Sequence, residues 1–273
     1  TYINPLRLVK LDKIYEKIFV NKKYTRKQFT KKLVWLVTRK FYDKCDWIIA
    51  PTNIIKNELI KNKFTVPIEV ISGGIELKKL KPIEKRRTNK RVRLLHVGRS
   101  SYEKNIHIVL QAMKIISAEK KDVCLDVIGF GPALNSLKKQ ASCLGLDKNV
   151  RFWGFVSDKE LHEAYRNSDI FVTASTVETL GLVILEAMVY GLPIVGVNKY
   201  AIPEVMKHNI NGYIIKPHDY KEMAEKLMYL IENKDLRIRM GQNSLNLIKE
   251  HSLNTVANKL ESIYTKLIGK TIK

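Results

Sequence analysis

The segment Asp169–Val195 constrains the fold most, because its pattern changes from strand to turn to helix and back to strand. Ile170–Ala174 is a short apolar run rich in β-branched and aromatic residues, which is typical of a buried strand. After a polar turn, the apolar residues of Leu180–Tyr190 fall at helical spacing. A Gly-Leu-Pro sequence ends that helix, and a second buried strand is expected at Ile194–Val197. The segment therefore predicts a strand–helix–strand unit.

The same alternation extends along the chain before this segment. Apolar runs predict further strands at Val92–Val97, Val123–Ile128 and Val150–Trp153, each followed by a helical pattern. Strands that alternate with helices predict an α/β fold with a parallel sheet covered on both faces. In such sheets ligands bind at the carboxyl ends of the strands. Glycine-rich or charged loops follow the predicted strands at that end, so we expect a ligand site there.

Two carboxylates stand out in the opening segment. Glu178 lies in the polar turn, and Glu186 lies on the helix among apolar neighbours that predict its partial burial. A buried carboxylate needs hydroxyl or cationic partners, and a ribose diol is a natural one. Gly181 marks the start of the helix, where free backbone N–H groups can face a phosphate. The simpler interpretation makes Glu178 a solvated loop residue and Glu186 a surface charge.

Two loops upstream carry weaker signals. Arg99 offers a planar fork and Lys104 a mobile charge, and both suit the oxygens of a diphosphate. A Gly-Arg pair after a strand is common, however, so this spacing is not specific. Gly129-Phe130-Gly131-Pro132 lacks the third glycine and the acidic residue of the dinucleotide-binding fingerprint. Alone, it predicts no more than a tight turn.

In chain order the sequence contains VGR-(x)4-K, IGFGP, FWGFVSDKELHEAYRNSDIFVTAS, E-(x)7-E with EAMVYGLPIV, and PEVMKHNINGYII. Together these motifs resemble the C-terminal half of a family 4 (group 1) glycosyltransferase of the GT-B type. The resemblance implies two Rossmann-like domains, the first truncated and the second complete. Residues 1–80 would be the C-terminal part of the first (acceptor) domain, 81–91 a linker, and 92–250 the donor-nucleotide-binding domain. Residues 251–273 would form a helix packing back towards the first domain.

The resemblance also implies roles for individual residues. Arg99 and Lys104 would grip the diphosphate of a nucleotide sugar, and Glu178 would lie beside the transferred sugar; these three are the expected catalytic residues. Glu186 would hold the ribose hydroxyls. The expected donor-binding residues are Gly98, Gly129, Gly154, Val156, Thr179, Leu180, Gly181 and Glu186. Members of this family retain anomeric configuration and usually need no metal, in agreement with the lack of an Asp-x-Asp motif. We expect no cofactor and UDP-glucose as the donor substrate.

The net charge of +22 is concentrated in one part of the chain. Residues 1–91 contain 24 lysines and arginines against 8 acidic residues, an excess of 16 positive charges. Lys22–Lys44 reads as a basic amphipathic helix, which can lie at an anionic membrane. The expected membrane-binding residues are Arg26, Lys27, Lys31, Lys32, Trp35 and Arg39. The alternatives are a helix packed on its own domain and a lysine-rich composition without function.

The basic run resembles, more loosely, bacterial enzymes that glycosylate diacylglycerol. We therefore expect transfer of a hexose from UDP-glucose to diacylglycerol at the inner face of the cell membrane. A capsule or cell-wall polysaccharide glycosyltransferase using UDP-galactose or GDP-mannose is the alternative. A basic membrane- or nucleic-acid-binding protein without catalysis is a different class, but no aromatic RNA platform or recognition-helix motif is present. Three widely spaced cysteines, Cys45, Cys124 and Cys143, fit a reducing cytoplasm. The sequence predicts no oligomeric state.

Overall fold

The computed structural model describes residues 26–77 and 91–271. They fall into two compact units, and we describe each by itself. The smaller unit contains residues 26–49 and 57–69, and the larger unit contains 50–56, 70–77 and 91–271. Residues 70–77 thus group with the larger unit, although the sequence suggested a boundary after residue 80. The expected segments at 1–25 and 78–90 lie outside the described residues.

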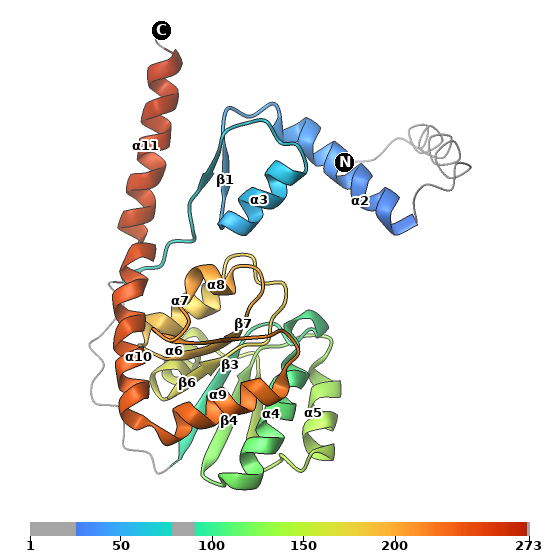
Figure 1. The fold of residues 1–273 in the computed structure, drawn as a ribbon, viewed down its shortest axis with the longest axis vertical. Helices are drawn as coiled ribbons and strands as arrows, with labels where there is room; N and C mark the ends of the chain where they lie inside the picture. Colours follow the sequence, from blue (N-terminus) through green and yellow to red (C-terminus); the bar gives the residue numbers. More distant parts are fainter. Residues whose placement is uncertain (1–25, 78–90, 272–273) are drawn as a thin grey trace. The chain divides into compact units, whose positions relative to one another are not determined.

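The larger unit is built on a parallel sheet of six strands (Figure 1). The strands are β3 (Val92–Val97), β4 (Val123–Ile128), β5 (Val150–Gly154), β6 (Ile170–Val172), β7 (Ile194–Val197) and β8 (Gly212–Ile215). Their order across the sheet is β5-β4-β3-β6-β7-β8, which is the Rossmann order. After β3, the strands β4 and β5 are added on one side of the sheet, and β6, β7 and β8 are added on the other side. The crevice between β3 and β6 is where such sheets bind their ligands.

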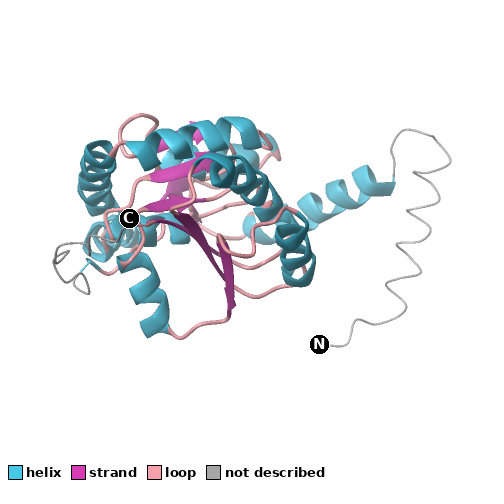
Figure 2. Ribbon diagram, turned by 90° about the horizontal axis from the view of Figure 1, so that it is seen from below, coloured by secondary structure: helices cyan, strands magenta, loops and turns pink. Residues whose placement is uncertain are grey.

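Helices cover both faces of this sheet (Figure 2). Helix α4 packs against α5 and α9, and α7 packs against α8 and α10. The strands read as nearly continuous apolar runs because both faces are covered, and Leu94, Leu95 and Phe171 are fully buried. The helices are η2 (Tyr102–Lys104), α4 (Ile106–Glu119), α5 (Leu134–Cys143), α6 (Asp158–Arg166), α7 (Leu182–Val189), α8 (Ile202–Val205), α9 (Tyr220–Glu232), α10 (Lys234–Leu247), η3 (Ile248–His251) and α11 (Leu253–Thr271).

Gly129 allows the loops after β3 and β4 to meet. Its φ is +133°, and a Cβ at this position would lie 1.9 Å from the carbonyl oxygen of Gly98. The backbone N–H of Gly129 donates to the carbonyl of Gly154 at 2.8 Å. Three strand-end loops therefore lie together at the carboxyl edge of the sheet. The sequence indicated only a tight turn here, because close approach of distant backbone leaves no periodic signal.

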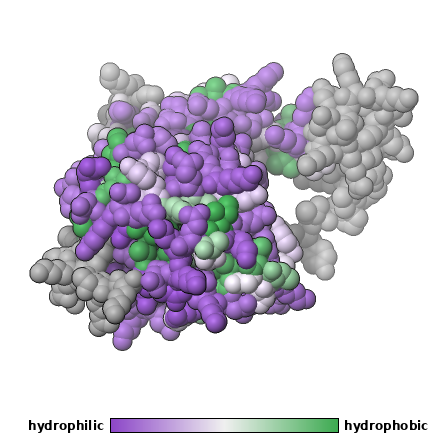
Figure 3. All heavy atoms as spheres, turned by 60° about the horizontal axis from the view of Figure 1, so that its bottom comes forward, coloured by the Kyte–Doolittle hydropathy of each residue, from purple (hydrophilic) through white to green (hydrophobic). Residues whose placement is uncertain are grey.

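The segment after strand β2 (Ile68–Val70) runs beside the start of α11 within the larger unit. Ile75 donates its N–H to the carbonyl of His251 at 2.9 Å and accepts from Leu253 at 3.1 Å. A Cβ on Gly74 would lie 2.8 Å from the Leu253 side chain, so the packing there is tight. The C-terminal helix is therefore anchored to residues 70–77. On the face in Figure 3, hydrophilic residues dominate and apolar ones reach the surface in limited patches.

The smaller unit contains α2 (Arg26–Tyr42), most of α3 (Asn53–Lys61) and most of strands β1 (Ile48–Ala50) and β2 (Ile68–Val70). The two strands pair in a two-stranded sheet. Phe64 is 6% exposed, and the rings of Trp35 and Tyr42 each lie 6.0 Å from it. These aromatic contacts fix one side of α2. Within residues 26–77 and 91–271, no helix is long and apolar enough to span a bilayer.

Gly129→Ala tests the close approach of the strand-end loops. The added methyl group would collide with the Gly98 carbonyl, so we expect the free energy of unfolding to fall by at least about 2 kcal/mol in denaturant titrations. Gly269→Ala on α11 is the matched control, because a Cβ added there would have no neighbour within 4 Å. That control should gain roughly 0.5–1 kcal/mol. Equal stability of Gly129→Ala and wild type would contradict the packing described.

Candidate donor-binding site

Two predicted residues meet at the crevice between β3 and β6. Nζ of Lys104, at the end of η2, lies 2.7 Å from Oε2 of Glu178, in the loop after β6. The two side chains are only 19% and 15% exposed, so this ion pair is largely removed from water. Asn105 ties the same loops together, since its Nδ2 donates to the carbonyl of Ala174 and to Oγ1 of Thr176. The structure therefore holds a cation and an anion in contact at the expected ligand edge.

Arg99 belongs to the same loop but has different surroundings. It lines an open cavity of about 500 Å³ together with Phe130, Gly131 and Asn135. Among the described residues, no ion pair or hydrogen bond joins its guanidinium to Glu178. Arg99 is exposed in the loop after β3, where its planar fork can bind an anionic group.

His96 is a site residue that the sequence reasoning missed. It is 1% exposed on β3, and its Nδ1 lies 3.0 Å from the carbonyl oxygen of Val172 on β6. Nδ1 must donate in that contact, which leaves Nε2 as an acceptor, and Nε2 is buried without a partner in the described residues. The pKa of His96 is lowered to about 4, mainly by burial and in smaller part by the charge of Lys104, while the hydrogen bond to Val172 and the charge of Glu178 act in the opposite direction. The only sign in the sequence was a polar residue at an inner position of a largely apolar strand.

Glu186 is half-buried on α7, as its apolar neighbours predicted. Burial raises the pKa of its carboxyl group. The hydroxyl of Tyr165, on α6, donates to Oε2 of Glu186 at 2.7 Å and lowers that pKa in part. Tyr165 is 1% exposed. This partner lies far from Glu186 in the sequence and carried no signal of its own.

The remaining predicted donor-binding residues lie in the strand-end loops. Gly181 adopts a left-handed conformation with φ of +73° as the N-cap of α7, so the helix begins two residues later than Leu180, the start that the periodicity predicted. Gly154 has a φ of +67°, and a Cβ added at this position would have no neighbour within 4 Å. Val156 packs against the core and Leu180 against Gly73, and both residues are partly buried. Thr179 is exposed in the same loop as Leu180.

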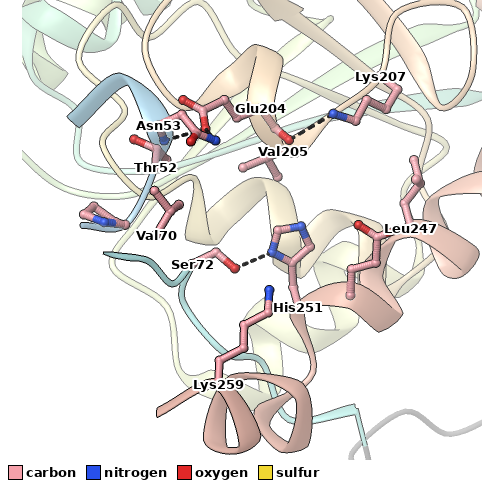
Figure 4. A pocket seen from close by; sticks show the side chains of 12 residues that line it. Thr52, Asn53, Val70, Ser72, Glu204, Val205, Lys207, Leu247, His251 and Lys259 are labelled. Atoms are coloured by element: carbon pink, nitrogen blue, oxygen red, sulfur yellow. Dashed lines mark hydrogen bonds between the residues drawn. The ribbon is translucent and has the colours of Figure 1, made fainter. Parts of the chain in front are cut away.

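A second, smaller cavity of about 170 Å³ lies in the larger unit, away from the predicted site residues (Figure 4). Both carboxylate oxygens of Glu204 accept backbone N–H groups at the start of α3, from Asn53 at 2.7 Å and Ile54 at 2.8 Å. Oγ of Ser72 lies 2.8 Å from Nδ1 of His251 (Figure 4). Oγ1 of Thr52 accepts from the N–H of Ile55 at 3.3 Å and caps α3. The cavity is thus bordered by contacts that hold the start of α3 against α8.

Residues 78–246 match the family model described as "Glycosyl transferases group 1", and the chain belongs to this family. This confirms the resemblance seen in the sequence. Among curated relatives, an alpha-monoglucosyldiacylglycerol synthase of Streptococcus pneumoniae is 37% identical over 175 residues, 60% of this chain and 40% of that protein. Spore coat protein SA of Bacillus subtilis is 38% identical over 184 residues, 63% of this chain and 48% of that protein. The chain spans about half the length of the curated relatives it matches.

Solved structures give the same fold. HepE of Anabaena, solved with UDP and glucose, has a TM-score of 0.77 at 21% identity, over 86% of this chain and 67% of that one. The pneumococcal O-GlcNAc transferase GtfA, solved with UDP and GlcNAc, has a TM-score of 0.75 at 21% identity, over 85% of this chain and 47% of that one. The expected α/β fold of the GT-B type is therefore confirmed.

His96→Phe tests whether the buried imidazole is neutral. The pKa of His96 in the folded protein is about 4, against an ordinary 6.5. Between these two pH values His96 is protonated in the unfolded chain but not in the folded protein. Stability should therefore fall as the pH drops from about 6.5 to about 4, by about 3 kcal/mol for this group. We expect His96→Phe to lose that much less stability than wild type over this range, measured by denaturant titration at each pH.

The control for this experiment is His208→Gln, because His208 is exposed. It should lose stability with falling pH as wild type does. Parallel curves for His96→Phe and wild type would mean that His96 is protonated in the folded protein, against the assignment made here.

Proposed function

We propose that this chain carries the donor site of a glycosyltransferase that moves a hexose from UDP-glucose to a hydroxyl group of a membrane lipid, with diacylglycerol as the acceptor. The observation that carries the proposal is the Lys104–Glu178 pair, held 2.7 Å apart in the crevice of a group 1 glycosyltransferase domain. Family membership supports the class of reaction. The exposed Arg99 and the N-terminus of α7 add positive charge at the same edge, which suits a diphosphate.

In the proposed reaction, the bond between the anomeric carbon and the β-phosphate oxygen breaks as the acceptor oxygen bonds to that carbon. The proton of the acceptor hydroxyl leaves with the nucleoside diphosphate. Arg99 and Lys104 stabilise the negative charge of this leaving group, which is the electrostatic role that a metal ion plays elsewhere. Glu178 lies beside the sugar and balances positive charge at the anomeric carbon. We propose that configuration is retained and that no metal is needed.

The lipid acceptor is supported by one relative and by the chemistry of α2. The relative named alpha-monoglucosyldiacylglycerol synthase is 37% identical, but spore coat protein SA is equally similar, so identity alone does not select the acceptor. On α2, Val34, Val37 and Phe41 are 57%, 59% and 69% exposed, and their spacing places them on one face. The exposed Lys31 and Lys40 flank this stripe on α2, and the exposed Lys44 follows the helix.

An exposed apolar stripe edged by lysines is the pattern of a helix that lies on an anionic membrane. We propose that α2 makes this contact and holds the protein at the cytoplasmic face of the cell membrane. Trp35, expected among the membrane residues, instead packs against Phe64, and Arg39 lies 3.9 Å from Asp43. Arg26 and Lys27 belong to α2, but their side chains are outside the described residues.

The donor site is tested by Arg99→Ala and Glu186→Ala in the full-length protein, with UDP-glucose and diacylglycerol as substrates and released UDP as the readout. Loss of a leaving-group cation or of the ribose anchor should lower turnover at sub-saturating donor about a hundredfold or more. Lys121→Ala is the control, because this exposed lysine precedes β4 at the opposite edge of the sheet. Normal turnover in both site variants would refute the site.

The membrane contact is tested by sedimentation with vesicles of phosphatidylglycerol or phosphatidylcholine. Wild type should bind only the anionic vesicles, and salt should weaken the binding. The double variant Lys31→Glu/Lys40→Glu should bind at least about tenfold more weakly, since each basic residue near the surface contributes about 1 kcal/mol. Lys234→Glu/Lys249→Glu, in the larger unit, is the charge-matched control and should bind as wild type does. Equal binding to both lipids, or equal loss in both variants, would contradict the proposal for α2.

A further inference from the structure

The ring of Tyr165 is held by other aromatic rings, and its hydroxyl has a defined position. These are the features expected of a residue that orients a neighbouring side chain. Its ring lies parallel to that of Tyr190, with centroids 5.3 Å apart and 6° between the planes. It also stacks on Phe171 of β6, with centroids 6.2 Å apart. The α6 helix that carries it begins with a capping box between Ser157 and Glu160, which fixes the helix start. The hydroxyl therefore has little freedom to move.

That hydroxyl is aimed at the carboxylate of Glu186. It lies 2.7 Å from Oε2, and the nearest competing acceptor, the carbonyl oxygen of Val183, is 3.4 Å away. Burial raises the pKa of Tyr165 well above its usual range, so the phenol keeps its proton and donates it to the carboxylate. Among the described residues, Oε1 of Glu186 accepts no hydrogen bond. One oxygen is thus fixed by the protein and the other is left for a ligand.

We propose that Tyr165 is the positioning residue for the nucleotide's ribose: it holds Oε2 of Glu186 so that the ionised carboxylate presents Oε1 to the ribose diol of a nucleoside diphosphate. The inference rests on the proposed function, which gives Glu186 the ribose. Tyr165 itself touches no substrate. Tyr165 orients the carboxylate of Glu186 and helps to keep it ionised. A half-buried carboxylate that loses such a donor is protonated more readily.

The groups that act on Glu186 are few. Tyr165 and His162, both on α6, lower the pKa of Glu186 while burial raises it. Tyr190, just after α7, interacts with Glu186, and its own pKa also responds to Arg166 and Glu163. The other helices packed on α7 are α8, α10 and η3, and within the described residues none of them brings a charge that shifts the pKa of Glu186. The hydroxyl of Tyr165 is therefore the contact whose removal should change this carboxylate most.

The test is the dissociation constant of UDP for the full chain, measured by calorimetry between about pH 5 and about pH 8, with GDP in parallel. Wild-type affinity should fall as the pH drops through the pKa of Glu186. Tyr165→Phe keeps the stacked ring but loses the donor, so the midpoint of this fall should move up by about one pH unit. Between the two midpoints the variant should bind about tenfold more weakly, and at the alkaline end of the range the two proteins should differ by less. Protonation of UDP is common to both and cancels.

Three comparisons separate positioning from a structural effect. Tyr190→Phe leaves the Tyr165 hydroxyl in place and should keep the wild-type midpoint. The 2′,3′-dideoxy analogue of UDP lacks the diol, so wild type and Tyr165→Phe should bind it equally. Adding Tyr165→Phe to Glu186→Gln should cause no further loss. A uniform loss of affinity by Tyr165→Phe at every pH, for both nucleotides, would overturn the inference.

The same data distinguish failure of the inference from failure of the proposed function. If Glu186→Gln binds UDP and GDP as wild type does, Glu186 holds no ribose and the proposed donor site is wrong. If Glu186→Gln binds weakly while Tyr165→Phe follows the wild-type pH profile, the donor site stands and Tyr165 is only a core residue.

Discussion

The order of the strands is the constraint on which the rest of this structure depends. The connections that leave β3 and β6 run to opposite sides of the sheet, so a crevice opens beyond the carboxyl ends of these two central strands. Loops that follow them must face each other across that crevice. This is why Lys104 and Glu178, far apart in the sequence, form a contact of 2.7 Å. The close approach of Gly129 to Gly98 adds a third loop to the same edge.

The charge states of His96, Lys104 and Glu178 at the crevice are compatible with one another. A protonated imidazole beneath Lys104 would repel the ammonium group, and burial keeps His96 neutral by lowering its pKa to about 4. Nδ1 donates to the Val172 carbonyl, so the neutral imidazole has an acceptor at Nε2, which is buried without a partner among the described residues. The positive charge beside His96 therefore comes from Lys104, and it is balanced by Glu178 until an anion arrives.

Strands with continuous apolar runs could be predicted residue by residue, and Val92–Val97 and Val123–Ile128 agree with the structure. Periodicity also indicated that Glu186 is partly buried, because its neighbours on the helix are apolar. Periodicity could not predict contacts between different elements, such as the hydrogen bond from Tyr165 to Glu186 or the one that Glu204 accepts from the start of α3. A pattern defines which face of an element is buried, whereas packing geometry decides what lies against it. Trp35 shows the same limit, since an amphipathic ring suits a membrane and a protein core equally.

The two carboxylates illustrate how one residue type can serve two tasks. Glu178 is paired with a cation, and Glu186 is paired with a neutral phenol. In the proposed reaction, a diphosphate bound to Lys104 would compete for the counter-ion of Glu178 as the sugar reaches that carboxylate. The negative charge of Glu178 would then be least compensated when positive charge develops at the anomeric carbon. Glu186 would undergo no such exchange, because its neutral partner leaves its charge intact before and after binding, as its proposed role as a fixed anchor for hydroxyl groups requires.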